Sequence, residues 1–364
     1  MSIQRVFNFN PGPATLPLSV MEKARDEFLS YQGCGMGIME CSHRGREFDS
    51  VRQSAEESLR QLMGISDDYA VLFLQGGASL QFAMAPMNLA GNDLQPMLYA
   101  DTGSWAAKAI KEAQRIGQVK VVYSGKASDY TEIADCETWD MAADDPAYLY
   151  ICSNNTIFGS QFNRFPEFPE TPMVADMSSD IMSRVIEVNR FGLIFAGAQK
   201  NLGPAGVTIV IVRKDLANRV PDTVPTMLRY TTHIEKESCF NTPPTFAIYM
   251  VGLVLEWIKE QGGVAAVEAV NDRKAAMLYS AIDRSDFYCG TVSPRCRSKM
   301  NVTFRLPDSE LEARFVREAT TAGLVGLKGH RSVGGIRASI YNAMPQAGVE
   351  ALIAFMEEFA ASRA

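Results

Sequence analysis

The chain contains little from which a metal site or a disulfide framework could be built. Its 364 residues include only three histidines, and no two of them have the four-residue spacing of a helical zinc pair. The seven cysteines are scattered and never form a C-x-x-C pair. We therefore expect no metal cofactor and no disulfide network.

Long apolar runs and an excess of positive charge are also missing. No stretch of about 18 apolar residues occurs, and the N-terminus lacks the apolar segment of a signal peptide. The formal net charge is -7, so the chain lacks the positive field that attracts nucleic acid or an anionic membrane. These features predict a cytoplasmic enzyme that acts on small-molecule substrates and has no nucleic-acid or membrane partner.

What the chain does contain is a regular alternation of short apolar runs and helical segments. Its length of 364 residues suggests roughly two domains, at about 150 residues per domain. The runs 193–196 and 207–212 are too close for a helical crossover, which predicts an antiparallel strand at the second. The pattern predicts an α/β fold with a mostly parallel seven-stranded sheet, its strands near 69–74, 97–100, 119–123, 147–153, 173–175, 193–196 and 207–212.

The pattern changes after Gly262-Gly263, which marks the expected domain boundary. We predict an N-terminal segment over 1–15, a large domain over 16–261 and a small C-terminal domain over 262–364. The small domain should be of the α+β type, with helices near 264–284, 308–322 and 347–361 and strands near 300–306 and 335–339.

Two residues after predicted strands carry the main chemical signal. Lys200 follows the run 193–196 in a loop rich in glycine and proline, where α/β sheets bind their ligands. Partial burial lowers the pKa of a lysine and frees its amine to attack a carbonyl group. Asp176 ends another apolar run, where its carboxylate could hold a protonated pyridine nitrogen or cap the next turn.

Three further features also follow predicted strands. The turn from Gly76 to Ser79 directs backbone N–H groups toward an anion at a helix start, although most glycine turns are only connections. Trp105 could stack on a cofactor ring or belong to the core. Thr156 could donate a hydrogen bond to a ring hydroxyl group. Packing alone does not require all these groups at successive strand ends, so together they favour one cofactor site.

This arrangement resembles the fold-type-I enzymes that depend on pyridoxal 5'-phosphate (PLP). Three stretches are similar to the phosphoserine aminotransferase family: FNFNPGP at 7–13, MECSHRGREF at 39–48 and KGHRSVGGIRAS at 328–339. The resemblance runs from about Phe7 to the C-terminus. It implies transamination of 3-phosphohydroxypyruvate with L-glutamate, giving O-phospho-L-serine and 2-oxoglutarate for serine biosynthesis. A related substrate of pyridoxine biosynthesis is also implied.

The same resemblance implies the residues of the cofactor site. Lys200 would form the Schiff base, Asp176 would hold the pyridine nitrogen, and Trp105 would stack on the ring. Ala78, Ser79, Thr156 and Gln199 would line the cofactor. Some members of the family have Gly-Arg in place of Ala78-Ser79. In a homodimer with shared active sites, the phosphate of the neighbouring subunit's cofactor would be reached by Asn241 and Thr242.

The substrate of that family carries a carboxylate and a phosphate, and two basic clusters are available to hold them. Arginine meets either group with two parallel hydrogen bonds, each contributing roughly 1.5–3 kcal/mol. The resemblance places Arg337 on the α-carboxylate. The phosphate, or the side-chain carboxylate of glutamate, would be held by His43, Arg44, His330 and Arg331.

Other functions remain open at this stage. A different aminotransferase would share the fold, and a cysteine desulfurase-like lyase would need a mobile nucleophile such as Cys289 or Cys296. A cofactor-binding regulator without turnover would not need the proton-moving groups. A dinucleotide-dependent dehydrogenase is disfavoured, because Gly76-Gly77 is not a G-x-G-x-x-G fingerprint.

Overall fold

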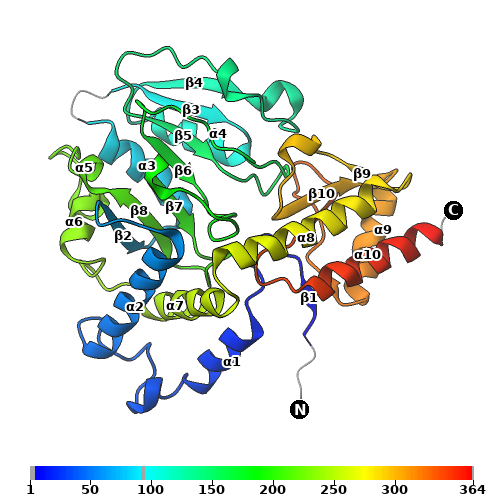
Figure 1. The fold of residues 1–364 in the computed structure, drawn as a ribbon, viewed down its shortest axis with the longest axis horizontal. Helices are drawn as coiled ribbons and strands as arrows, with labels where there is room; N and C mark the ends of the chain where they lie inside the picture. The colour runs from blue at the N-terminus through cyan, green and yellow to red at the C-terminus, as the bar shows by residue number, and fades with distance from the viewer. Residues whose placement is uncertain (1–4, 92–94, 363–364) are drawn as a thin grey trace.

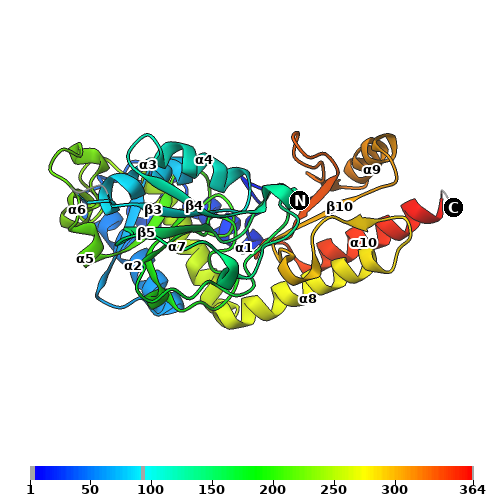
Figure 2. The same ribbon diagram turned by 90° about the horizontal axis from the view of Figure 1, so that it is seen from above.

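The computed structural model describes residues 5–91 and 95–362. Residues 1–4 of the predicted N-terminal segment and 363–364 of the predicted C-terminal domain lie outside this description. Figure 1 shows a larger body built on one sheet and a smaller body beside it. Helix α8 (Val264–Asp283) runs from the first body along the second, as the view in Figure 2 makes clear.

The larger body is built on a seven-stranded sheet with the order β2-β8-β7-β6-β5-β3-β4. Strand β8 is antiparallel to both of its neighbours, and all other pairs are parallel. The predicted α/β fold is therefore confirmed, including the antiparallel strand. The strands are β2 (Tyr69–Leu74), β3 (Met97–Asp101), β4 (Val119–Ser124), β5 (Tyr148–Cys152), β6 (Met173–Asp176), β7 (Phe191–Gly197) and β8 (Thr208–Arg213).

Helices cover both faces of this sheet. Along β5, Leu149 and Ile151 face one apolar core while Tyr148 and Tyr150 face the other, as the two-residue period of a strand requires. Helices α2 (Arg46–Met63) and α7 (Thr245–Glu260) pack into the first core, and α3 (Gly77–Leu89) and α4 (Ser104–Ala113) into the second. The other helices of this body are α1 (Leu18–Asp26), α5 (Lys214–Ala217) and α6 (Tyr230–Glu235).

The smaller body has its own sheet and its own core. Strand β10 (Asn301–Arg305) lies between β12 (Ile336–Ser339) and β9 (Cys289–Gly290), and both pairs are antiparallel. Helices α9 (Ser309–Thr321) and α10 (Gln346–Ala361) pack with α8 over this sheet. The predicted domain limits of 1–15, 16–261 and 262–364 stay predictions.

The N-terminal segment packs into the smaller body, which the sequence did not reveal. Strand β1 (Phe7–Asn8) pairs in parallel with β11 (Leu324–Val325), and Phe9 is fully buried in the core of the smaller body. Two-residue strands carry no readable periodicity, so only the folded chain shows this pairing. Among the described residues, every helix is too short or too polar to span a lipid bilayer.

Lys274 on α8 is expected to be a strong determinant of stability. Its side chain is fully buried, and its Nζ donates to the carbonyl oxygens of Ile340, Tyr341 and Met344 at 2.8–3.0 Å. Lys274→Met should lower the free energy of unfolding by roughly 3 kcal/mol, because three buried carbonyl groups lose their donor. Urea unfolding measures the loss. Lys214→Met at an exposed position should cost less than about 0.5 kcal/mol, and equal costs would contradict the assignment.

Candidate active site

Two adjacent parallel strands position the central acid and amine of the site. Asp176 is the last residue of β6 and pairs with Phe195 of β7. Strand β7 ends at Gly197, and the loop that follows is closed by N–H groups of residues 202 and 203 donating to the carbonyl oxygen of Ala198. Lys200 therefore lies beyond the carboxyl edge of the sheet, as the sequence predicted.

The carboxylate of Asp176 is buried, with 5% of the residue exposed. Its Oδ1 accepts a hydrogen bond from the backbone N–H of Ser178 at 2.9 Å, and Ser178 Oγ accepts from the N–H of Gly197 at 3.1 Å. Burial raises the pKa of Asp176, while the hydrogen bonds from Ser178 and the charge of Lys200 oppose this rise. A buried acid of this kind is suited to a cationic partner.

Lys200 lies in the electrostatic field of that acid. Burial lowers its pKa, and the negative charge of Asp176 is the largest opposing influence. The N-terminal segment closes over the lysine: a Cβ on Gly12 would lie 3.3 Å from Lys200 Cγ, and the N–H of Ala14 donates to the carbonyl oxygen of Gln199 at 2.9 Å. This contact explains the glycine in the 7–13 stretch, which the sequence could not place.

The lowered pKa of Lys200 predicts its behaviour toward amine reagents. In the cofactor-free chain, acylation of Lys200 should rise with a midpoint below the ordinary lysine value of about 10.4, because burial favours the neutral amine. Competitive labelling with acetic anhydride over a pH series, read by peptide mass spectrometry, measures this midpoint. In Asp176→Asn the midpoint should fall further, since the carboxylate raises this pKa. An unchanged or higher midpoint in that variant would contradict the pairing.

Three predicted residues, Trp105 on α4, Thr156 in the loop after β5 and Arg337 on β12, form one hydrogen-bonded chain. Trp105 Nε1 donates to Thr156 Oγ1 at 3.1 Å, and Arg337 Nη1 donates to the carbonyl oxygen of Thr156 at 2.8 Å. Arg337 is 6% exposed, and its buried Nε has no hydrogen-bond partner among the described residues. A buried guanidinium group with a free donor needs an acceptor that the chain itself does not provide.

His330 and Arg331 lie near Arg337 in the smaller body. The Nδ1 atom of His330 and Ser332 Oγ are 2.7 Å apart. Burial lowers the pKa of His330, and the positive charges of Arg337, Arg331 and Lys108 lower it further. The structure thus gathers three of the five predicted substrate residues into one cationic region.

A second group near the end of β2 consists of His43, Arg44, Asn241 and Thr242. Thr242 is held by Gln75, whose Nε2 donates to its carbonyl oxygen at 2.9 Å, next to the turn that carries Ala78 and the exposed Ser79. The charge of Arg44 acts on Cys239, which places the His43-Arg44 loop near Asn241. Among the described residues of this single chain, no hydrogen bond or ion pair joins His43, Arg44, Asn241 or Thr242 to Lys200.

A buried polar network beneath Asp176 was missed at the sequence level. Ser153 Oγ donates to the carbonyl oxygen of Asp176 at 3.0 Å and also contacts Asp180 Oδ1. Asp180 in turn accepts from Gln161 and Arg184, each at 3.2 Å. In the sequence these short polar residues lie between apolar runs and look like an exposed loop. The spacing of four between Asp180 and Arg184, which suits an ion pair, was the signal that could have revealed the network.

The two cysteines considered for a lyase are poor nucleophiles here. Cys296 is buried, its Sγ contacts the carbonyl oxygen of Thr131 at 3.6 Å, and burial raises its pKa. Cys289 is exposed but belongs to strand β9 rather than to a mobile loop. Neither arrangement favours a thiolate that moves to a bound substrate.

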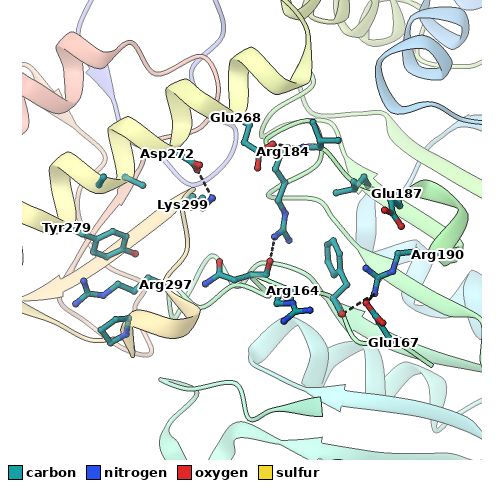
Figure 3. A pocket seen from close by; sticks show the side chains of 17 residues that line it. Arg164, Glu167, Arg184, Glu187, Arg190, Glu268, Asp272, Tyr279, Arg297 and Lys299 are labelled. Atoms are coloured by element: carbon teal, nitrogen blue, oxygen red, sulfur yellow. Dashed lines mark hydrogen bonds and ion pairs between the residues drawn. The ribbon is translucent and has the colours of Figure 1, made fainter. Parts of the chain in front are cut away.

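A separate cavity of about 650 Å³ lies between α8 and segment 163–190 (Figure 3). Its charges are largely matched: Lys299 pairs with Asp272 at 2.6 Å and Arg190 with Glu167 at 3.4 Å. Arg184 at its centre is held by Asp180, which is part of the buried network described above. None of the predicted cofactor or substrate residues is among its described lining, so we do not assign the chemistry to this cavity.

Comparison with known proteins relates the whole chain to one group. The family model for aminotransferase class-V matches residues 6–352. A phosphoserine aminotransferase from Geobacillus kaustophilus is 55% identical over 360 residues, which cover 98% of this chain and 99% of the relative.

Solved structures agree with this relationship. A phosphoserine aminotransferase from Bacillus circulans subsp. alkalophilus has 53% identity and a TM-score of 0.97, with 99% of each chain covered. Another phosphoserine aminotransferase, studied for radiation damage of its Schiff base, has 50% identity and a TM-score of 0.96, and 99% of this chain and 100% of that chain are covered.

Proposed function

Since the chain belongs to the aminotransferase class-V family, whose members are PLP-dependent enzymes, we propose that it transfers the amino group of L-glutamate to 3-phosphohydroxypyruvate. The products are O-phospho-L-serine and 2-oxoglutarate, in serine biosynthesis. The observation that carries this proposal is the buried Lys200 in the electrostatic field of Asp176 and of the buried Arg337, whose Nε has no hydrogen-bond partner among the described residues. The use of a related substrate in pyridoxine biosynthesis stays a prediction.

The residues at the sheet edge fit PLP. A buried carboxylate suits the protonated ring nitrogen, and a partly desolvated amine suits the aldehyde carbon, so Asp176 and Lys200 match its two ends. Trp105 would face the ring, Thr156 and Gln199 would line it, and the turn at Ala78 and Ser79 would hold the phosphate. When bound, PLP supplies a conjugated ring that accepts the electron pair released at the α-carbon of the substrate.

The chain's own groups then position the substrate and move its proton. Arg337 binds the α-carboxylate, because its free Nε and its fixed side chain direct donors toward that group. Lys200 Nζ takes the α-proton as a base and returns a proton as an acid, a role suited to an amine with a lowered pKa. Asp176 keeps the ring nitrogen protonated, because a buried negative charge stabilises a nearby positive one.

We further propose a homodimer in which each active site uses residues of both subunits. The second residue group, with His43, Arg44, Asn241 and Thr242, would complete the site of the neighbouring subunit. Exposed large apolar side chains occur near these residues in the sequence, and apolar side chains that form one exposed patch mark an interaction surface. They include Phe28 at 46%, Leu29 at 81%, Met39 at 49% and Phe240 at 39% exposure.

A direct assay distinguishes this function from the alternatives. The PLP-loaded chain is given ¹⁵N-labelled glutamate with 3-phosphohydroxypyruvate, and ¹⁵N-labelled O-phosphoserine is measured by mass spectrometry. The expected result is transfer to this acceptor at a kcat/KM well above that for pyruvate or glyoxylate. Equal use of those acceptors, or release of sulfur from cysteine, would contradict the proposal. We place the enzyme in the cytoplasm, which its seven free thiols support.

A further inference from the structure

Lys108 is an exposed lysine of α4 that the functional site has not yet accounted for. Its Nζ lies 4.1 Å from the centroid of the Trp105 ring, three residues earlier on the same helix. Such a contact between a cation and an aromatic face contributes about 0.5–1 kcal/mol at an exposed site. Within the described part of the chain Lys108 has no ion pair, although acidic residues outnumber basic ones by 42 to 35 in the sequence.

The position of Lys108 connects it to the predicted substrate residues. Trp105 donates a hydrogen bond to Thr156, and Arg337 donates one to Thr156, so the lysine contacts the residue at one end of this hydrogen-bonded series. Its charge acts on His330 of the smaller body, together with the charges of Arg337 and Arg331. Four basic side chains from the two bodies, Lys108, His330, Arg331 and Arg337, thus act on one region. Their mutual repulsion raises the free energy of the folded chain, and a bound anion would relieve it.

We propose that Lys108 is a further substrate-binding residue, whose ammonium group contacts the phosphate of 3-phosphohydroxypyruvate and favours a phosphate over a carboxylate. The inference rests on the proposed function. A phosphate carries a charge of about -1.5 to -2 at neutral pH, whereas the side-chain carboxylate of glutamate carries a single charge. An additional cation therefore strengthens phosphate binding more than carboxylate binding.

The first test compares two substitutions on the same helix. Lys108→Gln should raise the KM for 3-phosphohydroxypyruvate about tenfold, raise the KM for glutamate less than about threefold, and leave kcat within about twofold. Lys111→Gln, at an exposed position on α4 away from Trp105, is the matched control and should change neither KM. Lys108→Arg keeps the charge and should restore most of the affinity for the phosphorylated substrate. Equal KM values for Lys108→Gln and Lys111→Gln would overturn the proposal.

A second readout needs neither substrate nor cofactor. The chain has three histidines, so the imidazole signals of His330 can be followed in a pH titration by NMR. Lys108→Gln should raise the pKa of His330, because the lysine charge lowers it, and Lys111→Gln should not. If the pKa of His330 is the same in Lys108→Gln as in the unaltered chain, Lys108 does not act on this region and the proposal is wrong. If the unaltered chain fails to aminate 3-phosphohydroxypyruvate while the His330 shift occurs, the proposed function fails and the placement of Lys108 stands.

Discussion

Replacing Lys200 with alanine is expected to lower kcat for transamination by about 10⁴-fold or more. The substitution removes both the amine that holds the cofactor and the group that moves the α-proton, and proton transfer by a positioned side chain alone contributes 10²–10⁴-fold. The rate of 2-oxoglutarate formation from glutamate and 3-phosphohydroxypyruvate measures the loss. Lys200 is suited to both tasks because burial lowers its pKa beside Asp176.

Two matched variants separate chemistry from charge. Lys200→Arg keeps a positive charge near Asp176, but a guanidinium group cannot give up its proton in a protein, so this variant should be equally inactive. Lys214→Ala, at the exposed first residue of the short helix α5, should retain full activity. Activity above about 1% in either Lys200 variant would contradict the role of the amine.

The second large effect is expected at Arg337. Arg337→Lys should lower kcat/KM about 100-fold for both substrates, because both carry the α-carboxylate that the planar fork of arginine would bind. The substitution also removes the guanidinium donor to the carbonyl oxygen of Thr156. It therefore weakens the series of hydrogen bonds that joins Arg337, Thr156 and Trp105. Steady-state kinetics with each substrate varied in turn measures the loss.

A control in the smaller body shows whether this effect is local. Arg317→Lys makes the same exchange at an exposed position on α9 and should leave both kcat/KM values unchanged. A loss for 3-phosphohydroxypyruvate alone in Arg337→Lys would place Arg337 on the phosphate instead. An unchanged kcat/KM for both substrates would show that Arg337 does not bind substrate.

The sequence was sufficient for the sheet and for the two central residues. Apolar runs such as 69–74 and 193–196 gave the strands, because strands buried on both faces have continuous apolar sequences. Asp176 and Lys200 could be named since each follows such a run, at the edge where parallel strands bind ligands.

What escaped prediction depends on contacts between distant parts of the chain. The pairing of β1 with β11 involves only two residues on each side, and the burial of Phe9 depends on a core more than 250 residues later in the chain. The Asp180 and Arg184 network likewise forms only after residues 153, 161 and 180 meet. Only the folded chain shows that, among the described residues, no hydrogen bond or ion pair joins the His43 and Asn241 group to Lys200.

The most direct test of the central claim is to find which residue binds the cofactor. The PLP-loaded chain is reduced with borohydride, which makes the linkage permanent, and digested for peptide mass spectrometry. The account predicts the added mass on Lys200 alone, and none after prior addition of glutamate in excess. A label on any other lysine, or no label on a chain that still transfers amino groups, would contradict it.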